Sequence, residues 1–180
     1  MMKFYQKLDK NTFFVLLSAF IWIFICNVIV QLLHVPLASI GIPGWTIFLA
    51  NVLFFIKSNP KHLEGLLENA CGGIFGLIGA IGLIYLNIFF GNIGIPTLLA
   101  TIIAILIFLF LTIAIHPILP YVFNNMALCF FLVALVNEET QVNLITNPWS
   151  HFAGVILGNL VVNVGTILIT GLVTKMLARR

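Results

Sequence analysis

Residues 97–115, TLLATIIAILIFLFLTIAI, form a run without a single charged side chain. An α-helix rises about 1.5 Å per residue, so a run of this length reaches across the roughly 30 Å hydrocarbon core of a bilayer. A soluble fold would have to bury such a helix on every side, and a chain of 180 residues has too small an interior for that. The stretch therefore predicts a transmembrane helix.

The composition of the whole chain extends this prediction. Hydrophobic residues make up 62% of the sequence and charged residues 7%, with a mean hydropathy of +1.19. A typical soluble domain has about 25% charged residues, so the few charges here cannot cover a water-facing surface. The backbone must then be satisfied inside helices, and we expect an all-α integral membrane protein.

Six apolar segments follow one another in the order long, short, long, long, short, long. They cover about residues 13–33, 44–56, 66–90, 97–116, 121–136 and 148–174, with a polar loop expected at 137–147. The first segment follows Lys3, Lys7 and Lys10, as in a signal peptide. It is longer than a usual signal sequence and lacks a small-x-small cleavage site, so we expect it to remain as a helix.

The basic residues predict the topology. Three precede the first segment, Lys57 and Lys61 follow the second, and three follow the sixth. If all six segments cross, these sites share one side, whereas the connections 34–43, 91–96 and 137–147 contain no Lys or Arg. The positive-inside rule then makes both termini cytoplasmic. Re-entrant short segments are the alternative, but re-entry would place Lys57 and Lys61 outside, so six crossings are favoured.

The order of long and short segments divides one membrane domain into two three-helix repeats, residues 1–90 and 91–180. Because each repeat has an odd number of crossings, the second would be inverted, an arrangement that creates a site near the bilayer midplane. Aromatic residues and glycines recur in both halves: Trp45 and Phe54 with Tyr121 and Phe130, and Gly72 and Gly76 with Gly154 and Gly158.

Amide side chains stand out among the apolar residues. Asn51 lies in the middle of the first short segment, and Asn124 and Asn125 lie near the start of the second. Asn159 and Asn163 share a helical face in the last segment, since they are four residues apart. An amide offers donors and acceptors without charge, which suits a pathway for a small uncharged polar solute. Hydrogen bonding between helices is the alternative explanation.

Three further residues complete the predicted site. Glu68 could bind a proton or a cation, although it lies near the cytoplasmic end of its segment, where it could also reach water. His151 could titrate near neutral pH or be an interfacial histidine, and Trp45 could cover a site or anchor at the interface. The predicted substrate-binding residues are Trp45, Asn51, Glu68, Asn124, Asn125 and His151.

The sequence offers no pattern for catalysis, metal, cofactor or nucleic acid. Cys26, Cys71 and Cys129 lie far apart within apolar stretches, without CxxC spacing, so we interpret them as small apolar side chains. There is no HxxxH or HExxH motif, no nucleophile–base pair and no phosphate-binding loop. We therefore expect a protein that is not an enzyme and carries no cofactor and no metal.

The motif GW-x₂-F-x₅-FF at residues 44–55 is followed by an acidic and small-residue stretch leading into G-x₃-G, and later by an aromatic-rich segment, Trp149 and a second G-x₃-G. This pattern resembles the YcdZ-like family of small bacterial membrane proteins over about residues 13–170. The resemblance implies six helices in the bacterial cytoplasmic (inner) membrane, and no function, because that of the family is unknown. Asn124 and Asn125 depart from the small and proline residues of the family.

These observations predict a channel or facilitator for a small polar, uncharged solute, acting in the lipid bilayer as a homo-oligomer. A substrate-binding subunit of a larger importer is an alternative. The small membrane subunits of vitamin importers have an alanine-rich docking stripe on their first helix, and here that helix has only Ala19. A membrane scaffold without a pathway is the third possibility.

Overall fold

The computed structural model describes residues 10–33, 37, 39–57 and 63–179, and all the regular structure within them is helical. Four helical stretches in this part of the chain are long and apolar enough to cross a membrane, and a bent helix pair, Asn125–Ala134 with Glu138–Thr146, could make a fifth crossing. The four stretches are Lys10–Leu32, Glu64–Asn92, Thr97–Ile115 and Pro148–Leu177. The prediction of an all-helical chain suited to a membrane is confirmed.

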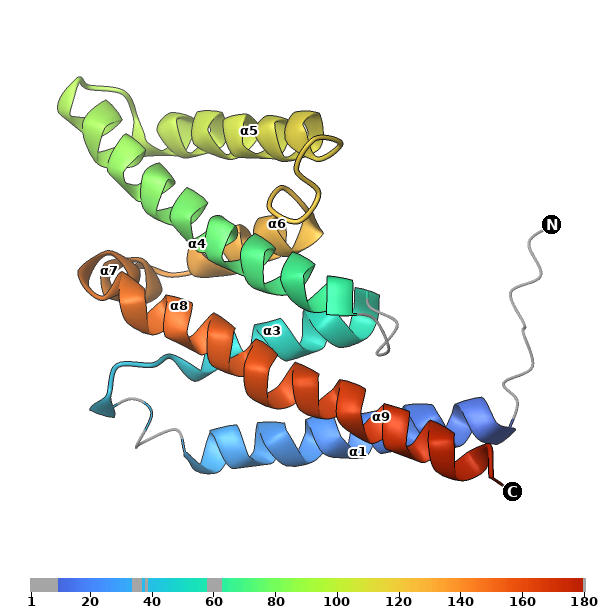
Figure 1. Ribbon diagram of the computed structural model, residues 1–180. Helices are drawn as coiled ribbons and strands as arrows, with labels where there is room; N and C mark the ends of the chain where they lie inside the picture. Colours follow the sequence, from blue (N-terminus) through green and yellow to red (C-terminus); the bar gives the residue numbers. More distant parts are fainter. Residues whose placement is uncertain (1–9, 34–36, 38, 58–62, 180) are drawn as a thin grey trace.

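The helices follow the predicted apolar segments closely (Figure 1). The last segment is one long helix in three parts, because a π-helical stretch, η1, interrupts it. The bounds are α1 Lys10–Leu32, α3 Gly44–Lys57, α4 Leu63–Asn92, α5 Thr97–Ile115, α6 Asn125–Ala134, α7 Glu138–Thr146, α8 Pro148–Leu157, η1 Gly158–Asn163 and α9 Val164–Leu177.

The region after α6 differs from the prediction. A polar loop was expected at 137–147, but α7 occupies most of it and turns by 107° from α6. Asn137 caps the new helix by accepting a 2.7 Å hydrogen bond from the Thr140 backbone N–H. Glu138 and Glu139 occupy the first turn, where the helix dipole favours acidic side chains. Leu144 is fully buried, so the helix is also held against the core.

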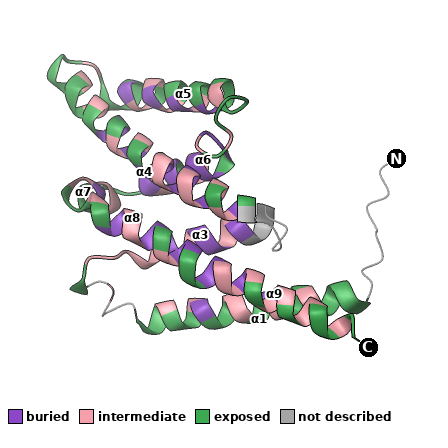
Figure 2. Cartoon of the chain, in the orientation of Figure 1, coloured by how far each residue is buried: buried purple, intermediate pink, exposed green. Residues whose placement is uncertain are grey.

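α1, α3, α4, α5 and α6 run in alternating directions, and the continuous helix from α8 to α9 runs opposite to α6 (Figure 1). α1 begins and α9 ends at the same end of the bundle, and α3 also ends and α4 begins at that end. α1 and α5 lie on the outside: only 11% of the apolar window of α1 and 22% of that of α5 are buried. Figure 2 shows that much of both helices is exposed, and the exposed side chains are mainly apolar, which suits contact with lipid.

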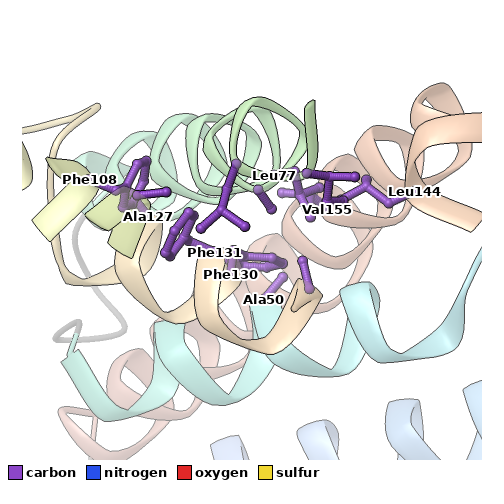
Figure 3. Packing of buried hydrophobic residues seen from close by; sticks show 13 residues of the cluster. Ala50, Leu77, Phe108, Ala127, Phe130, Phe131, Leu144 and Val155 are labelled. Atoms are coloured by element: carbon purple, nitrogen blue, oxygen red, sulfur yellow. The ribbon is translucent and has the colours of Figure 1, made fainter. Parts of the chain in front are cut away.

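The core is centred on the short helix α6 (Figure 3). Phe130 and Phe131 are fully buried there, and Phe131 stacks on Phe108 of α5 with ring centroids 4.0 Å apart. Leu77 of α4 and Val155 of α8 join the same cluster. The short predicted segment is thus an interior helix covered by protein rather than by lipid.

Two close helix contacts mirror each other. In α4, Gly76 lies against the Ala127 carbonyl and the Phe130 side chain of α6. In the last segment, Gly158 lies against Ile47 and Ala50 of α3. A Cβ atom at either glycine would overlap these neighbours. The closing helix of each half therefore packs on the short helix of the other half.

Candidate functional site

Four fully or almost fully buried asparagines lie where α3, α4 and η1 meet. Asn51 of α3, Asn69 of α4 and Asn163 of η1 are 0% exposed, and Asn159 of η1 is 4% exposed. Two of the four lie in the π-helical stretch, a type of helix that is rare and often marks functional sites.

Three of these asparagines form a closed ring of hydrogen bonds with the Ala50 carbonyl of α3. The Asn69 Nδ2 donates to the Ala50 oxygen at 2.5 Å and to the Asn159 Oδ1 at 3.1 Å. The Asn163 Nδ2 donates to the same two oxygens at 3.2 and 3.0 Å. The ring uses both hydrogens of the Asn69 Nδ2 and both of the Asn163 Nδ2, whereas the Asn159 Nδ2 donates to the Val155 carbonyl at 2.9 Å. This arrangement, called the amide ring below, joins α4 and η1 to α3.

Some polar atoms of the four asparagines have no hydrogen-bond partner among the described residues. The Oδ1 atoms of Asn69 and Asn163 are buried and have no hydrogen-bond partner among the described residues. Within the same part of the chain, both the Oδ1 and the Nδ2 of Asn51 are also unpartnered. Leaving a buried polar group unsatisfied costs about 1–3 kcal/mol, so native structures rarely do it without a reason.

Asn51 is the one asparagine of the four whose side chain has no structural role in the described contacts. It lies next to Ala50 in the chain, midway along α3, and shares the buried face with Ile47 and Phe54. A leucine would fill the same space without an unsatisfied amide. Packing therefore does not explain its identity, whereas a polar ligand would.

Trp45 and His151 meet on the side of this region toward the start of α3. Their ring centroids are 5.9 Å apart, and Trp45 also contacts Phe130 at 6.2 Å. His151 is fully buried; its Nδ1 lies 3.1 Å from the Asn147 carbonyl oxygen. The buried Nε2 has no partner in the described part of the chain. Trp45 is roughly 9 Å from Asn51 along α3, and His151 is roughly 12 Å from Asn159 along the last long helix.

Trp45 also lines an open pocket of about 610 Å³ beside the start of α3. Gln31 of α1 and Glu139 and Asn143 of α7 contribute polar groups to its wall. Trp45 thus contacts the pocket on one side and the buried His151 on the other.

The remaining predicted site residues lie elsewhere. Asn124 caps α6: its Oδ1 accepts from the N–H groups of Met126 and Ala127 at 2.8 and 3.1 Å, and its Nδ2 donates to the Glu68 carbonyl at 3.0 Å. Asn125 is exposed, and Glu68 is half-buried. The structure therefore brings Trp45 to His151 and places Asn51 beside the amide ring. It places Asn124, Asn125 and Glu68 around the start of α6.

No family model, curated protein or solved structure matches this chain. The resemblance to the YcdZ-like family stays a prediction, and the function is argued from the geometry. Among the described residues, no group of three His, Cys, Asp or Glu side chains could hold a metal ion.

Two parts of the site were not selected from the sequence. Asn159 and Asn163 had a visible signal, their spacing of four residues, but nothing indicated that Asn69 of another helix would join them. Trp22 gave no signal at all. Its Nε1 donates a 3.0 Å hydrogen bond to the Val162 carbonyl of η1, and its ring lies over Gly165. These contacts join residues 90 to 143 positions apart, which local patterns cannot reveal.

Proposed function

We propose that this protein is a channel or facilitator for a small, polar, uncharged solute, with its binding site at Asn51 beside the amide ring. One observation carries the proposal: Asn51 is completely buried, yet neither polar atom of its amide has a partner among the described residues. Polar groups are expensive inside a membrane protein, so a buried amide without a partner there points to a pathway or a binding site.

The unpartnered atoms define the chemistry of the solute. Asn51, Asn69 and Asn163 offer three acceptor oxygens without a partner among the described residues, and of these three amides only that of Asn51 also has an unpartnered nitrogen. A matching solute therefore has several N–H or O–H donors and at least one acceptor, as small primary amides and polyols have. The four asparagines carry no charge, so this region offers no counter-ion to an ionic solute.

The proposed pathway begins at the open pocket next to Trp45. A solute would pass from there by Trp45 and the unpartnered Nε2 of His151 to Asn51. The π-helical stretch supports this route, because irregular backbone in a membrane protein occurs where it lines a cavity or is buried in protein.

The architecture that we propose has six crossings in two inverted halves. Both termini lie in the cytoplasm of a bacterium. Two observations support it: the alternating helix directions and the mirrored glycine contacts of α4 with α6 and of η1 with α3. The short helices would then carry the site between the halves, as in other inverted-repeat proteins. The apolar outer faces of α1 and α5 are available to lipid or to a further copy of the chain.

Solute flux into proteoliposomes tests the proposal. Stopped-flow light scattering would compare the uptake of urea, formamide, glycerol and potassium chloride with that of empty liposomes. We expect a faster uptake of at least one neutral solute, and none of the salt. Asn51→Leu should reduce this uptake by about tenfold or more. It should keep the fold, because leucine has the same branched arrangement of four side-chain heavy atoms as asparagine and needs no hydrogen bond.

Asn87→Leu is the matched control. Asn87 is an amide of the long helix α4, and its Nδ2 donates to the Thr101 Oγ1 at 3.0 Å, between α4 and α5. This variant should transport as the wild type does. Folded protein without flux for any of the solutes, or equal flux in the wild type and Asn51→Leu, would contradict the proposal.

A substrate-binding subunit of an importer remains the second candidate, because the 610 Å³ pocket beside Trp45 is large enough for a bound ligand. In that case a solute would bind without flux, and an energising partner would co-purify. A scaffold would behave differently again: Asn51→Leu would leave the cellular phenotype intact, whereas disruption of the Gly76 contact would abolish it.

A further inference from the structure

A second pocket lies between α1 and α9, at the end of the bundle where α1 begins and α9 ends (Figure 1). Its volume is about 470 Å³, within the roughly 300–1,000 Å³ range of small-molecule sites. Its wall is almost entirely apolar, with Phe14, Leu17 and Ile21 from α1 and Val173 and Met176 from α9. We call it the α1–α9 groove.

The mouth of the groove is basic. Arg179, two residues beyond the end of α9, lines it directly. Lys10 begins α1 and precedes the lining residue Phe14 by four positions, so it faces the same way. The described residues that line the groove include no acid. The apolar α1–α9 groove therefore ends beside two basic side chains, Arg179 and Lys10.

We infer that the α1–α9 groove binds an anionic phospholipid, with an acyl chain along the apolar wall and the phosphate at Arg179. The guanidinium can bind a phosphate with two parallel hydrogen bonds, and Lys10 at the start of α1 adds attraction. A free phosphate would have no use for the apolar wall, whereas a lipid satisfies both parts. Basic pockets between membrane helices on the cytoplasmic side are known to bind anionic headgroups.

The site would also help to hold α1 in place. α1 is the least buried of the long helices, and its contacts are mainly with α9. A lipid in the groove would touch both helices at once, so binding would favour the docked position of α1 by linkage. This role is separate from the solute pathway, because the groove and the amide ring share no lining residue.

Native mass spectrometry of the purified full chain provides the test. The protein would be offered phosphatidylglycerol and phosphatidylcholine with identical acyl chains. We expect selective retention of phosphatidylglycerol. Arg179→Gln should weaken that preference about fivefold, and the double variant Lys10→Gln/Arg179→Gln about 25-fold, as expected for about 1 kcal/mol per basic residue near an anionic surface.

Two comparisons distinguish the effect of the headgroup on lipid retention from the effect of the groove and from that of net charge. Lys57→Gln removes one positive charge at a different connection and should keep the preference. Ser18→Phe should fill the groove and reduce the retention of both lipids, since Ser18 lies in its wall. If that variant does not fold, Val173→Phe fills the same space from α9. Excess inorganic phosphate should not displace the bound lipid.

Equal retention of the two lipids by the wild type would overturn the proposal. So would a loss of preference in Lys57→Gln as large as in Arg179→Gln, because the attraction would then be a property of net charge. Displacement by inorganic phosphate alone would show an anion site without a lipid chain, and this too would overturn it. None of these outcomes depends on solute transport.

Discussion

At Gly76 the α4 backbone lies directly against the Ala127 carbonyl and the Phe130 side chain of α6. Gly82, six residues later in the same helix, has no atom within 4 Å of the position that a Cβ would take. We expect Gly76→Ala to destabilise the protein by about 1–3 kcal/mol, because the two helices would have to separate. Thermal unfolding in detergent measures this.

Gly82→Ala is the control within the same helix. It should leave the unfolding temperature unchanged or raise it, since alanine is favoured over glycine in a helix by up to about 1 kcal/mol. If both alanine variants behaved alike, the tight contact of α4 with α6 would be refuted.

A second contrast at the residue scale concerns two buried asparagines. Asn163→Leu removes both donors that Asn163 gives to the amide ring, so the Ala50 carbonyl and the Asn159 oxygen each lose a partner. We expect a loss of about 1–3 kcal/mol in unfolding free energy. Asn51→Leu should cause no loss, because no described hydrogen bond is broken. The same unfolding assay compares the two, and a larger loss for Asn51→Leu would assign Asn51 a structural role.

At the scale of elements, the π-helical stretch η1 is joined to α1 through Trp22. Trp22→Phe keeps an aromatic ring over Gly165 but removes the hydrogen bond to the Val162 carbonyl. We expect a loss of about 1 kcal/mol and faster amide hydrogen exchange in α1. Trp149→Phe is the matched control: Trp149 is 77% exposed, so the exchange of α1 should not change. Unchanged exchange in Trp22→Phe would mean that the indole does not hold α1.

The long helices could be predicted because each is a continuous apolar run bounded by proline, glycine or polar residues. Helix α7 was missed because its sequence, EETQVNLIT, is polar and its helical signals are one capping asparagine and two glutamates. The π-helical stretch was also missed. Nothing in GNLVVN sets it apart from an ordinary helix, and its contacts come from α1, α3 and α4.

For the whole molecule, the central prediction is the number of crossings. In variants that each add one cysteine to the wild type, a membrane-impermeant maleimide should label Lys61→Cys only from the cytoplasmic side and Glu139→Cys only from the outside. The wild type provides the background, because its three cysteines lie in apolar segments. Labelling of Lys61→Cys from outside would make α3 re-entrant, and labelling of Glu139→Cys from inside would do the same for α6 with α7.

The candidate site shows what a sequence can and cannot supply at this scale. Asn51 could be selected, because an amide in the middle of an apolar segment is conspicuous. Asn124 was equally conspicuous, yet the structure uses it to cap α6. Local sequence does not distinguish a cap from a ligand-binding amide when the helix start is misplaced by four residues, from 121 to 125.

The exchange of partners between the halves has a consequence for biosynthesis. The face of α4 that carries Gly72 and Gly76 packs against α6 and its capping residue Asn124. α3 packs against α8 and η1, which are made late in synthesis. When residues 1–90 have been made, the nascent chain therefore lacks α6, which packs on this face of α4, and lacks α8 and η1, which pack on α3. The two halves should mature only together: expressed as separate polypeptides, each should be degraded alone and rescued when both are made in the same cell.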